Sequence, residues 1–394
     1  MSTTKKHSPW LILVVMLISM VSGAICMNKV APVLSNIVAD LSISSGTLSG
    51  LLMSIFTFTG IILSIPMGVL TTKYGTFKTG LFSLLAIIAG SVLGAVSTGY
   101  SLLLVSRLIE GLGLMFLGAI GPAAVAGAFA GANGGTAMGL LMCYMSFGQI
   151  IALNVAPMMA EAGSWRNFWW VSAVFGAVAL VLWVILIRDM DGESTAETAE
   201  NENAGAALTD VLANKSVWFV CITFLAFMIV HMGVFNYLPT YFTEVGGVSA
   251  TTAGSLTSVA SLIGIPVGIV GGMIADKCGS IKIPLGITMV LLAVIVGVLP
   301  MFNSSSYLVF IVLYGIASMA EAGLSFTAVT KVVKANQSAV ASATLNTAQW
   351  LGAFLSTMVF GTLLDNFGWN KSFYIMVPLA LIGAAAAFFN KDLN

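Results

Sequence analysis

Long apolar runs, separated by short polar loops, are the feature that most constrains the fold of this chain. We count twelve of them. They cover approximately residues 10–37, 47–70, 79–97, 102–126, 137–160, 167–187, 216–241, 251–274, 283–301, 307–330, 339–363 and 372–389. A hydrocarbon core about 30 Å thick requires roughly 20 apolar residues per helix. Continuous apolar runs also differ from the alternating pattern of barrel strands. The runs therefore predict an all-α integral membrane protein with twelve transmembrane helices.

Composition supports this interpretation and excludes several functions. Hydrophobic residues make up 58% of the 394-residue chain and charged residues 8%, whereas soluble domains carry about 25% charged residues. The formal net charge is zero and there is no basic tract, so we expect no nucleic-acid partner. Four cysteines lack the spacing of metal ligands, and we expect them to be reduced packing residues. No metal and no cofactor is predicted.

A short polar loop occurs twice in the chain. The offset is 204 residues, and it pairs Gly68, Lys73, Gly75 and Lys78 with Gly272, Lys277, Gly279 and Lys282. The same offset pairs Gly111 with Gly315, Gly148 with Gly352, and Trp165 with Trp369. A constant offset across separated landmarks indicates a tandem repeat. We therefore predict a six-helix bundle at 1–187, an acidic cytoplasmic linker at 188–215 and a second six-helix bundle at 216–394.

The basic residues predict the orientation. With a cytoplasmic N-terminus, eleven loop or terminal lysines and arginines fall inside and two, Arg166 and Lys371, fall outside. Both termini are then cytoplasmic, and we expect a multi-pass protein of the cytoplasmic (inner) membrane. An alternative interpretation of the N-terminus is a signal peptide ending near Ala24, but its cleavage would remove part of a repeat unit.

Five ionisable residues lie far from any loop: Lys29, Arg107, Glu110, His231 and Glu321. A Lys, Arg or acidic side chain at mid-bilayer costs about 2.5–3.5 kcal/mol on insertion scales, so these groups must face one another or a wet cavity. Arg107 and Glu110 are three residues apart and can pair on one helix face. We then expect Lys29 to be the free cation that binds a substrate anion, with Arg107 beside it.

The acids and the histidine are the candidates for proton coupling. Glu321 would be the free acid that carries a proton, with Glu110 and His231 as further candidates, because histidine titrates near neutral pH. The competing interpretation is a structural network of ion pairs without substrate contact.

Other polar residues of the apolar runs are secondary candidates for substrate binding. They are Asn28, Tyr144, Gln149, Asn154, Asn236, Tyr237, Asn346, Gln349 and Trp350. Polar amides in membrane helices also bond to neighbouring helices, which is the alternative role. We expect Trp165, Trp169, Trp170 and Trp369 to lie at the outer interface of the membrane.

The duplicated loop resembles the signature Gly-x-x-x-Asp-Lys-x-Gly-x-x-Lys of the major facilitator superfamily of secondary transporters. The second copy contains Asp276, whereas Thr72 stands at the equivalent place in the first. Arg107 followed by Gly111 also resembles the fourth-helix motif of this superfamily. The resemblance implies two six-helix pseudo-repeats around a central cavity lined by helices 1, 4, 7 and 10, the helices that carry the five ionisable residues. We expect a monomer.

The loops suit a cytoplasmic gate. Asp276 can accept hydrogen bonds from a helix N-terminus in the other half, where the helix dipole favours an anion. Lys277 and Lys282 can pair with acids or with the phosphates of membrane lipid. The expected gate residues are Gly68, Lys73, Gly75, Lys78, Gly272, Asp276, Lys277, Gly279 and Lys282. The alternative is that these loops only set the topology.

The first helix, with Asn28, Lys29 and Pro32, loosely resembles that of bacterial anion porters of the cyanate type. We therefore expect a secondary active transporter of a small polar anion or zwitterion, working by proton-coupled symport and alternating access, and not an enzyme. One alternative is a proton-driven efflux antiporter, although helix 5 lacks the Gly-Pro pattern of that class. A membrane-embedded enzyme or a channel is more remote, because no His-Glu-x-x-His or comparable spacing occurs.

Overall fold

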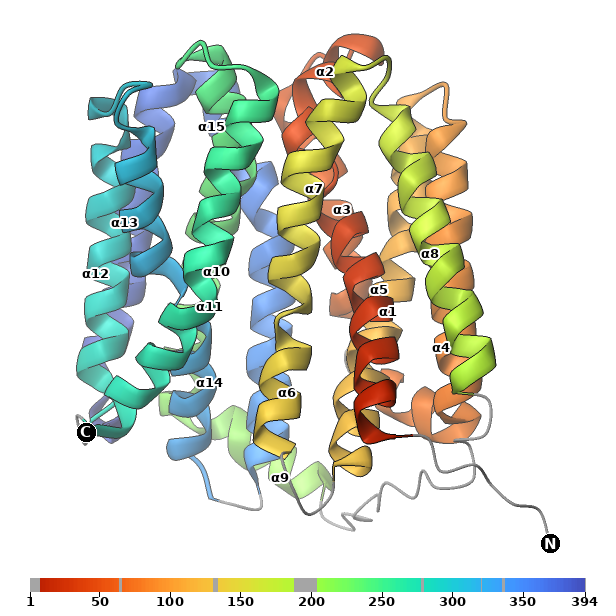
Figure 1. Ribbon diagram of the computed structural model, residues 1–394. Coiled ribbons are helices and arrows are strands. Elements are labelled where there is room, and N and C mark those ends of the chain that lie inside the picture. Colours follow the sequence, from red (N-terminus) through yellow and green to blue (C-terminus); the bar gives the residue numbers. More distant parts are fainter. Residues whose placement is uncertain are drawn as a thin grey trace, which may run out of the picture. The chain divides into compact units, whose positions relative to one another are not determined.

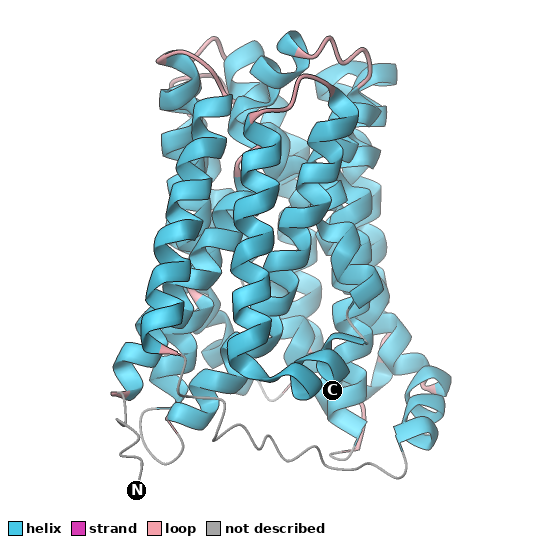
Figure 2. Cartoon of the chain, turned by 90° about the vertical axis from the view of Figure 1, so that its right-hand side faces the viewer, coloured by secondary structure: helices cyan, strands magenta, loops and turns pink. Residues whose placement is uncertain are grey.

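A computed structural model describes residues 8–63, 66–129, 134–187, 204–277, 280–319, 321–334 and 337–393. Within these ranges the regular structure is helical, without strands (Figure 2). Eleven helical segments of the described chain are long and apolar enough to cross a membrane. The last of them, Val340–Phe389, has 50 residues and contains two of the twelve expected spans. The predicted all-α membrane fold is thus confirmed.

The described chain packs as two compact units, the first drawn from Met1–Leu41 and Ile55–Glu200 (Figure 1). Its elements are α1 (Pro9–Asn28), η1 (Ala31–Val33), α2 (Leu34–Asp40), the later part of α3 (Gly46–Leu63), α4 (Pro66–Ala95), α5 (Tyr100–Ala128), α6 (Gly134–Met142), α7 (Tyr144–Glu161) and α8 (Arg166–Leu186). Helix α1 packs against α5, α7 and α8, and α4 packs against α5 and α8.

The second unit is drawn from Ser42–Ser54 and Asn201–Asn394. Its elements are the first part of α3, α9 (Ala204–Ala213), α10 (Lys215–Glu244), α11 (Ala250–Lys277), α12 (Lys282–Val298), η3 (Leu299–Met301), α13 (Tyr307–Met319), α14 (Glu321–Lys331), α15 (Ser338–Phe389) and η5 (Lys391–Leu393). Helix α15 packs along α10 and α12. Helix α9 lies inside the segment expected to be a linker, whereas residues 188–203 of that segment are outside the described residues.

Several expected helices are interrupted, and the sequence explains the clearest cases. Helix α1 ends at Asn28, inside the expected run 10–37, because Pro32 has no N–H to donate to the Asn28 carbonyl. Gly75 (φ 76°) in α4 and Gly368 (φ 72°) in α15 instead lie between expected helices, and the left-handed backbone there separates two helical segments in each element. Glycine adopts this conformation without the strain that a Cβ would add. Gly75 is therefore required for the turn inside the duplicated motif.

Small residues allow close helix packing in the first unit. A Cβ at Gly148 of α7 would lie 2.3 Å from the Cβ of Ala24 in α1. A Cβ at Gly94 of α4 would lie 2.3 Å from the indole of Trp169 in α8. Such contacts supply the van der Waals packing that holds membrane helices together. They also fix the indole of Trp169 beside α4, inside the unit.

The first residues of α3 are capped by a side chain of α15. The backbone N–H of Gly46 donates to Asp365 Oδ1 at 2.8 Å, and the N–H of Thr47 donates to Oδ2 at 3.3 Å. A carboxylate at a helix N-terminus satisfies unpaired N–H groups and favours the helix dipole. The two helices approach closely, since a Cβ at Gly361 would lie 2.0 Å from the carbonyl oxygen of Gly46.

Candidate functional site: a buried charge network

Three charged side chains of the first unit form one fully buried network. Lys29 Nζ lies 2.5 Å from Glu110 Oε1 and 3.2 Å from Ser91 Oγ. Arg107 Nη1 lies 2.6 Å from Glu110 Oε2. Lys29, Arg107 and Glu110 are each 0% exposed. The ion pair between Arg107 and Glu110 was expected from their spacing and is confirmed.

The break after α1 explains where Arg107 binds. The last carbonyls of a helix have no partner within the helix. Arg107 Nη1 donates to the carbonyl of Cys26 at 2.5 Å, and Nη2 donates to the carbonyl of Met27 at 3.1 Å. A cation at a helix C-terminus also interacts favourably with the helix dipole. The end of α1 at Pro32 thus creates the acceptors that hold the guanidinium.

The structure corrects the expectation that Lys29 is a free cation. Glu110 has two carboxylate oxygens, and one binds Lys29 while the other binds Arg107. The network therefore contains two cations and one acid, so its formal charge is +1. A buried charge without a counter-charge is costly. The Nε–H of Arg107 is also buried without an acceptor among the described residues.

Trp169 and Ser91 complete the surroundings of Lys29. The ammonium lies 4.5 Å from the centre of the Trp169 ring, within the range of a cation–π interaction. Trp169 is fully buried and Trp165 is 3% exposed, so both rings pack inside the protein, while their depth near the outer interface stays a prediction. Trp170 is 46% exposed. Trp369 packs against Tyr241 and Phe373.

Glu321 is buried in the second unit between two hydroxyl groups. Its Oε1 lies 3.1 Å from Ser325 Oγ, and its Oε2 contacts Thr288 Oγ1. Thr288 Oγ1 also lies 2.9 Å from the Leu285 carbonyl, which can only accept. A hydroxyl has one proton. If Thr288 donates it to Leu285, the contact with Oε2 needs a proton on Glu321, so the geometry suits a protonated carboxyl group.

His231 forms a second buried polar contact in this unit. Its Nδ1 lies 2.8 Å from Tyr314 Oη, and this hydroxyl is also 3.0 Å from the His231 carbonyl. The imidazole stacks on Phe227 at 5.1 Å with 5° between the planes. The imidazole of His231 therefore contacts the ring of Phe227 and the hydroxyl group of Tyr314. These contacts suit a neutral packed histidine as well as a proton relay.

The secondary candidates differ in their surroundings. The amides of Asn28 and Asn236 donate to carbonyls of their own helices, each at 2.8 Å, which leaves their oxygens as acceptors. Tyr237 Oη contacts the first residues of α3, 3.3 Å from the Gly46 carbonyl. Gln149 is buried. Half-buried positions are occupied by Tyr144, Asn154, Asn346, Gln349 and Trp350.

Most of the expected gate falls outside what the structure describes. Gly279 is outside the described residues, and the side chains of Lys73, Asp276 and Lys277 and the surroundings of Gly68 and Gly272 are as well. Gly75, Lys78 and Lys282 are described. Within the described chain, no group of three or more His, Cys, Asp or Glu residues is arranged to hold a metal ion.

Comparison with known proteins assigns the family. The sequence profile described as "Major Facilitator Superfamily" matches residues 11–357 and 248–393. The chain belongs to the Major Facilitator Superfamily. The resemblance inferred from the duplicated loop is therefore confirmed, and this Major Facilitator Superfamily member is a multi-pass membrane protein.

Three relatives of this superfamily member are named as transporters of different anions. A "Hexuronate transporter" of Bacillus subtilis (strain 168) is 25% identical over 60% of this chain and 57% of its own length. The "Sialic acid transporter NanX" of Escherichia coli (strain K12) is 26% identical over 54% of this chain and 52% of its own. A "Putative inorganic phosphate cotransporter" of Drosophila melanogaster is 28% identical over 55% and 44%. The chain thus spans about half the length of these relatives.

A solved structure has the same fold. It is a bacterial homologue of the human lysosomal transporter Spinster, in an inward-facing and unoccupied conformation. The TM-score is 0.83 at 15% identity, with 99% of this chain and 98% of that chain covered. At this identity the likeness shows the fold alone.

Proposed function

We propose that this protein is a secondary active transporter of a small organic or inorganic anion, which it carries together with a proton by alternating access. The observation that carries the proposal is the buried network of two cations and one acid in the first unit. An anion bound beside Lys29 and Arg107 would neutralise the excess positive charge. The relatives support this substrate class, because hexuronate, sialic acid and phosphate are all anions.

In this proposal Lys29 is the residue that exchanges partners. Arg107 is held by two backbone carbonyls of α1, whereas Lys29 is held by side chains, Glu110 and Ser91. A substrate anion and the Glu110 carboxylate compete for the same ammonium. Protonation of Glu110 weakens its hold on Lys29 and thereby favours anion binding, which links the two ligands.

Glu321 is the second proposed proton site. It lies on the other unit, among hydroxyl groups that suit its protonated form. A carboxylate buried without a cation carries a desolvation cost that a bound proton removes. No ion pair of Glu321 is found among the described residues. Glu321 can therefore hold a proton while the anion occupies the first unit.

We infer two six-helix halves at 1–187 and 216–394, joined by the 188–215 linker, in a monomer of the inner membrane with cytoplasmic termini. Asn28, Tyr144, Gln149, Asn236, Tyr237, Asn346, Gln349 and Trp350 are proposed to contact the substrate. The loop residues around Gly75 and Gly279 are proposed to form the gate.

Proteoliposomes with a trapped pH dye test the function. A hexuronate, sialic acid and phosphate are added in turn in sodium-free buffer, without an imposed gradient. We expect saturable internal acidification with at least one anion, and its loss in Lys29→Gln and Glu321→Gln. Lys371→Gln, which removes an exposed lysine outside the network, serves as the control and should behave as the original protein.

Two outcomes would contradict the proposal. Unchanged apparent affinity in Lys29→Gln would exclude Lys29 as the anion ligand. Internal alkalinisation on adding organic cations, with no response to anions, would identify an efflux antiporter instead.

A further inference from the structure

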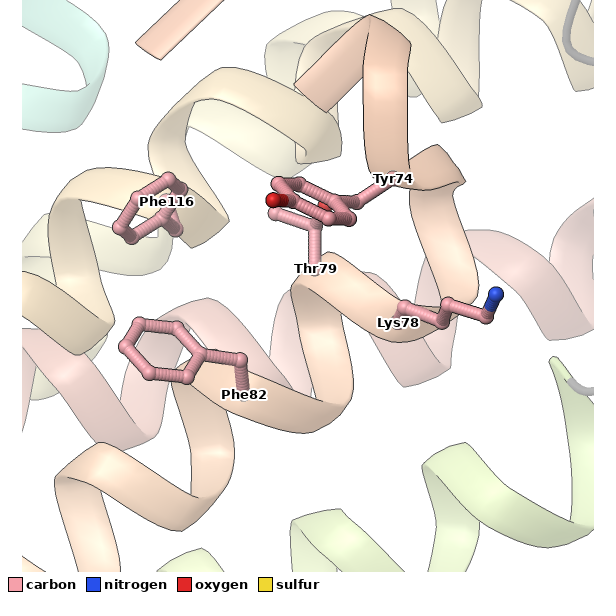
Figure 3. A pocket seen from close by; sticks show the side chains of 5 residues that line it. All are labelled: Tyr74, Lys78, Thr79, Phe82 and Phe116. Atoms are coloured by element: carbon pink, nitrogen blue, oxygen red, sulfur yellow. The ribbon is translucent and has the colours of Figure 1, made fainter. Parts of the chain in front are cut away.

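A cavity of about 290 Å³ lies beside the break of α4, outside the charge network. Its lining residues are Tyr74, Lys78, Thr79 and Phe82 of α4, and Phe116 of α5 (Figure 3). All five belong to the first unit. The cavity therefore depends on two packed helices and on the turn at Gly75.

The turn at Gly75 shapes the cavity. The left-handed backbone of Gly75 redirects α4, and Thr79 Oγ1 donates to the Gly75 carbonyl at 2.7 Å. The turn brings Tyr74, which precedes it, beside residues that follow it. Phe82 and Phe116 meet edge to face, with their ring centroids 5.5 Å apart. A Cβ-bearing residue at 75 would strain this turn.

Two of the three aromatic rings of the cavity are open to the outside of the fold, whereas Phe116 is 9% exposed. Tyr74 is 51% exposed and Phe82 is 50% exposed, although both belong to a segment apolar enough to span a membrane, Tyr74–Ala95. We infer that the exposed rings of such a segment face lipid at the end of the span. Rings exposed in this way offer an apolar floor to an acyl chain.

Lys78 supplies the charge at this cavity. Its stem lines the cavity, and its ammonium points away from the rings of Phe82 and Phe116 (Figure 3). A lysine in this position keeps its methylene groups on apolar surface while the ammonium reaches polar groups. Among the described residues, Lys78 is in no ion pair. One end of the cavity is thus cationic and the floor is aromatic.

We propose that this cavity binds an anionic phospholipid, with the headgroup phosphate on Lys78 and an acyl chain on Tyr74, Phe82 and Phe116. A soluble anion would gain only the contact with Lys78, whereas a lipid gains both the charge contact and the apolar contact. Lysines near a membrane surface attract anionic lipids. The proposal is independent of the transported substrate.

The tandem repeat provides a matched control. Lys282 stands 204 residues after Lys78, but Gly286 stands at the position of Phe82. A Cβ at Gly286 would lie 2.4 Å from the ring of Phe388, so the side chain of Phe388 occupies that space. Lys282 therefore has the same charge at the equivalent position without the aromatic floor.

Native mass spectrometry of the purified full chain tests the proposal. Detergent-solubilised protein is titrated with phosphatidylglycerol and, separately, with phosphatidylcholine. We expect the first phosphatidylglycerol to bind about fivefold more weakly to Lys78→Gln, the effect of one lysine. Phe82→Ala should also weaken it, whereas Lys282→Gln should not. Millimolar inorganic phosphate should not displace the lipid.

Three results would overturn the proposal. Equal weakening in Lys78→Gln and Lys282→Gln would indicate general attraction to basic loops. Phosphatidylcholine binding as tightly as phosphatidylglycerol would exclude headgroup selection by Lys78. Displacement by inorganic phosphate would indicate a simple anion site. Thermal unfolding of each variant, expected to be unchanged because Lys78 and Phe82 are exposed, shows that the fold is intact.

Discussion

Replacing Glu110 by Gln is the sharpest perturbation of the buried charge network. Glu110 accepts from both Lys29 and Arg107, and all three side chains are fully buried. The variant leaves two cations facing an amide, so the formal charge of the network rises from +1 to +2. Removing one partner of a buried pair typically costs about 3–5 kcal/mol, because the remaining charge is uncompensated.

The expected size of the effect is large enough to measure. A unit of about 150–250 residues loses roughly 2–4 °C in Tm for each kcal/mol by which its free energy of unfolding falls. We therefore expect Glu110→Gln to lower Tm by on the order of 10 °C. Lys29→Gln leaves a neutral Arg107–Glu110 pair, so we expect it to lower Tm less than Glu110→Gln does. The double variant should cost less than the sum of the single variants, with a coupling energy of about 0.5–3 kcal/mol.

Thermal unfolding in detergent micelles, followed by tryptophan fluorescence at one fixed scan rate, measures these differences. The fixed rate matters because unfolding that is irreversible gives a rate-dependent midpoint. Glu161→Gln is the matched control, since Glu161 is an exposed acid of the same unit, and it should stay within about 0.5 kcal/mol. A Tm of Glu110→Gln equal to that of Glu161→Gln, or additive effects in the double variant, would refute the network.

Three further predictions follow from contacts elsewhere. Asp365→Ala should lower the free energy of unfolding by about 0.5–2 kcal/mol, because it removes the cap of α3. Asp365→Asn keeps an acceptor oxygen and should melt near the original Tm. An equal loss of stability in both variants would contradict the cap. Gly148→Val should lower the free energy of unfolding by about 1–3 kcal/mol or more, because the new Cβ meets Ala24. Gly118→Ala is the control, because a Cβ at Gly118 has open space and the variant should keep the original Tm. Equal Tm values for the two variants would be inconsistent with the close packing. Thr288→Val should reduce proton-coupled uptake in liposomes, whereas Thr288→Ser should retain it. Full activity of the valine variant would show that the contact between Thr288 and Glu321 is not needed for transport.

The fold was predictable because lipid imposes a strong constraint. Backbone groups in hydrocarbon must bond within helices, so each apolar run of sufficient length predicts one span. The same constraint located the charge network, since Lys29, Arg107 and Glu110 cannot face lipid. The spacing of three residues between Arg107 and Glu110 was enough to predict their pairing.

The partners of Lys29 were not predictable in the same way. Helical periodicity assigns a residue to a face, but it does not say which neighbouring helix covers that face. Ser91 and Trp169 reach Lys29 because α4 and α8 pack closely at Gly94, a contact between distant segments. The only sequence signal was a small residue, Gly94, within an apolar run, and Gly is common in this chain.

Thr288 and Asp365 were missed for a related reason. Thr288 is a single hydroxyl in an apolar helix, and its importance comes from Glu321 on another helix. Asp365 follows an apolar run and reads as an ordinary loop acid, yet it caps α3. In both cases the partner lies far away in the sequence, so only the packed structure reveals the contact.

The central claim is that an anion competes with Glu110 for Lys29 and that a proton binds with the anion. Titration calorimetry in two buffers of different ionisation enthalpy counts the protons taken up when the anion identified in liposomes binds to the purified protein. We predict uptake of about one proton per anion in the original protein and in Glu321→Gln, and none in Glu110→Gln. Anion binding without proton uptake in the original protein, or the same uptake in Glu110→Gln, would contradict this account.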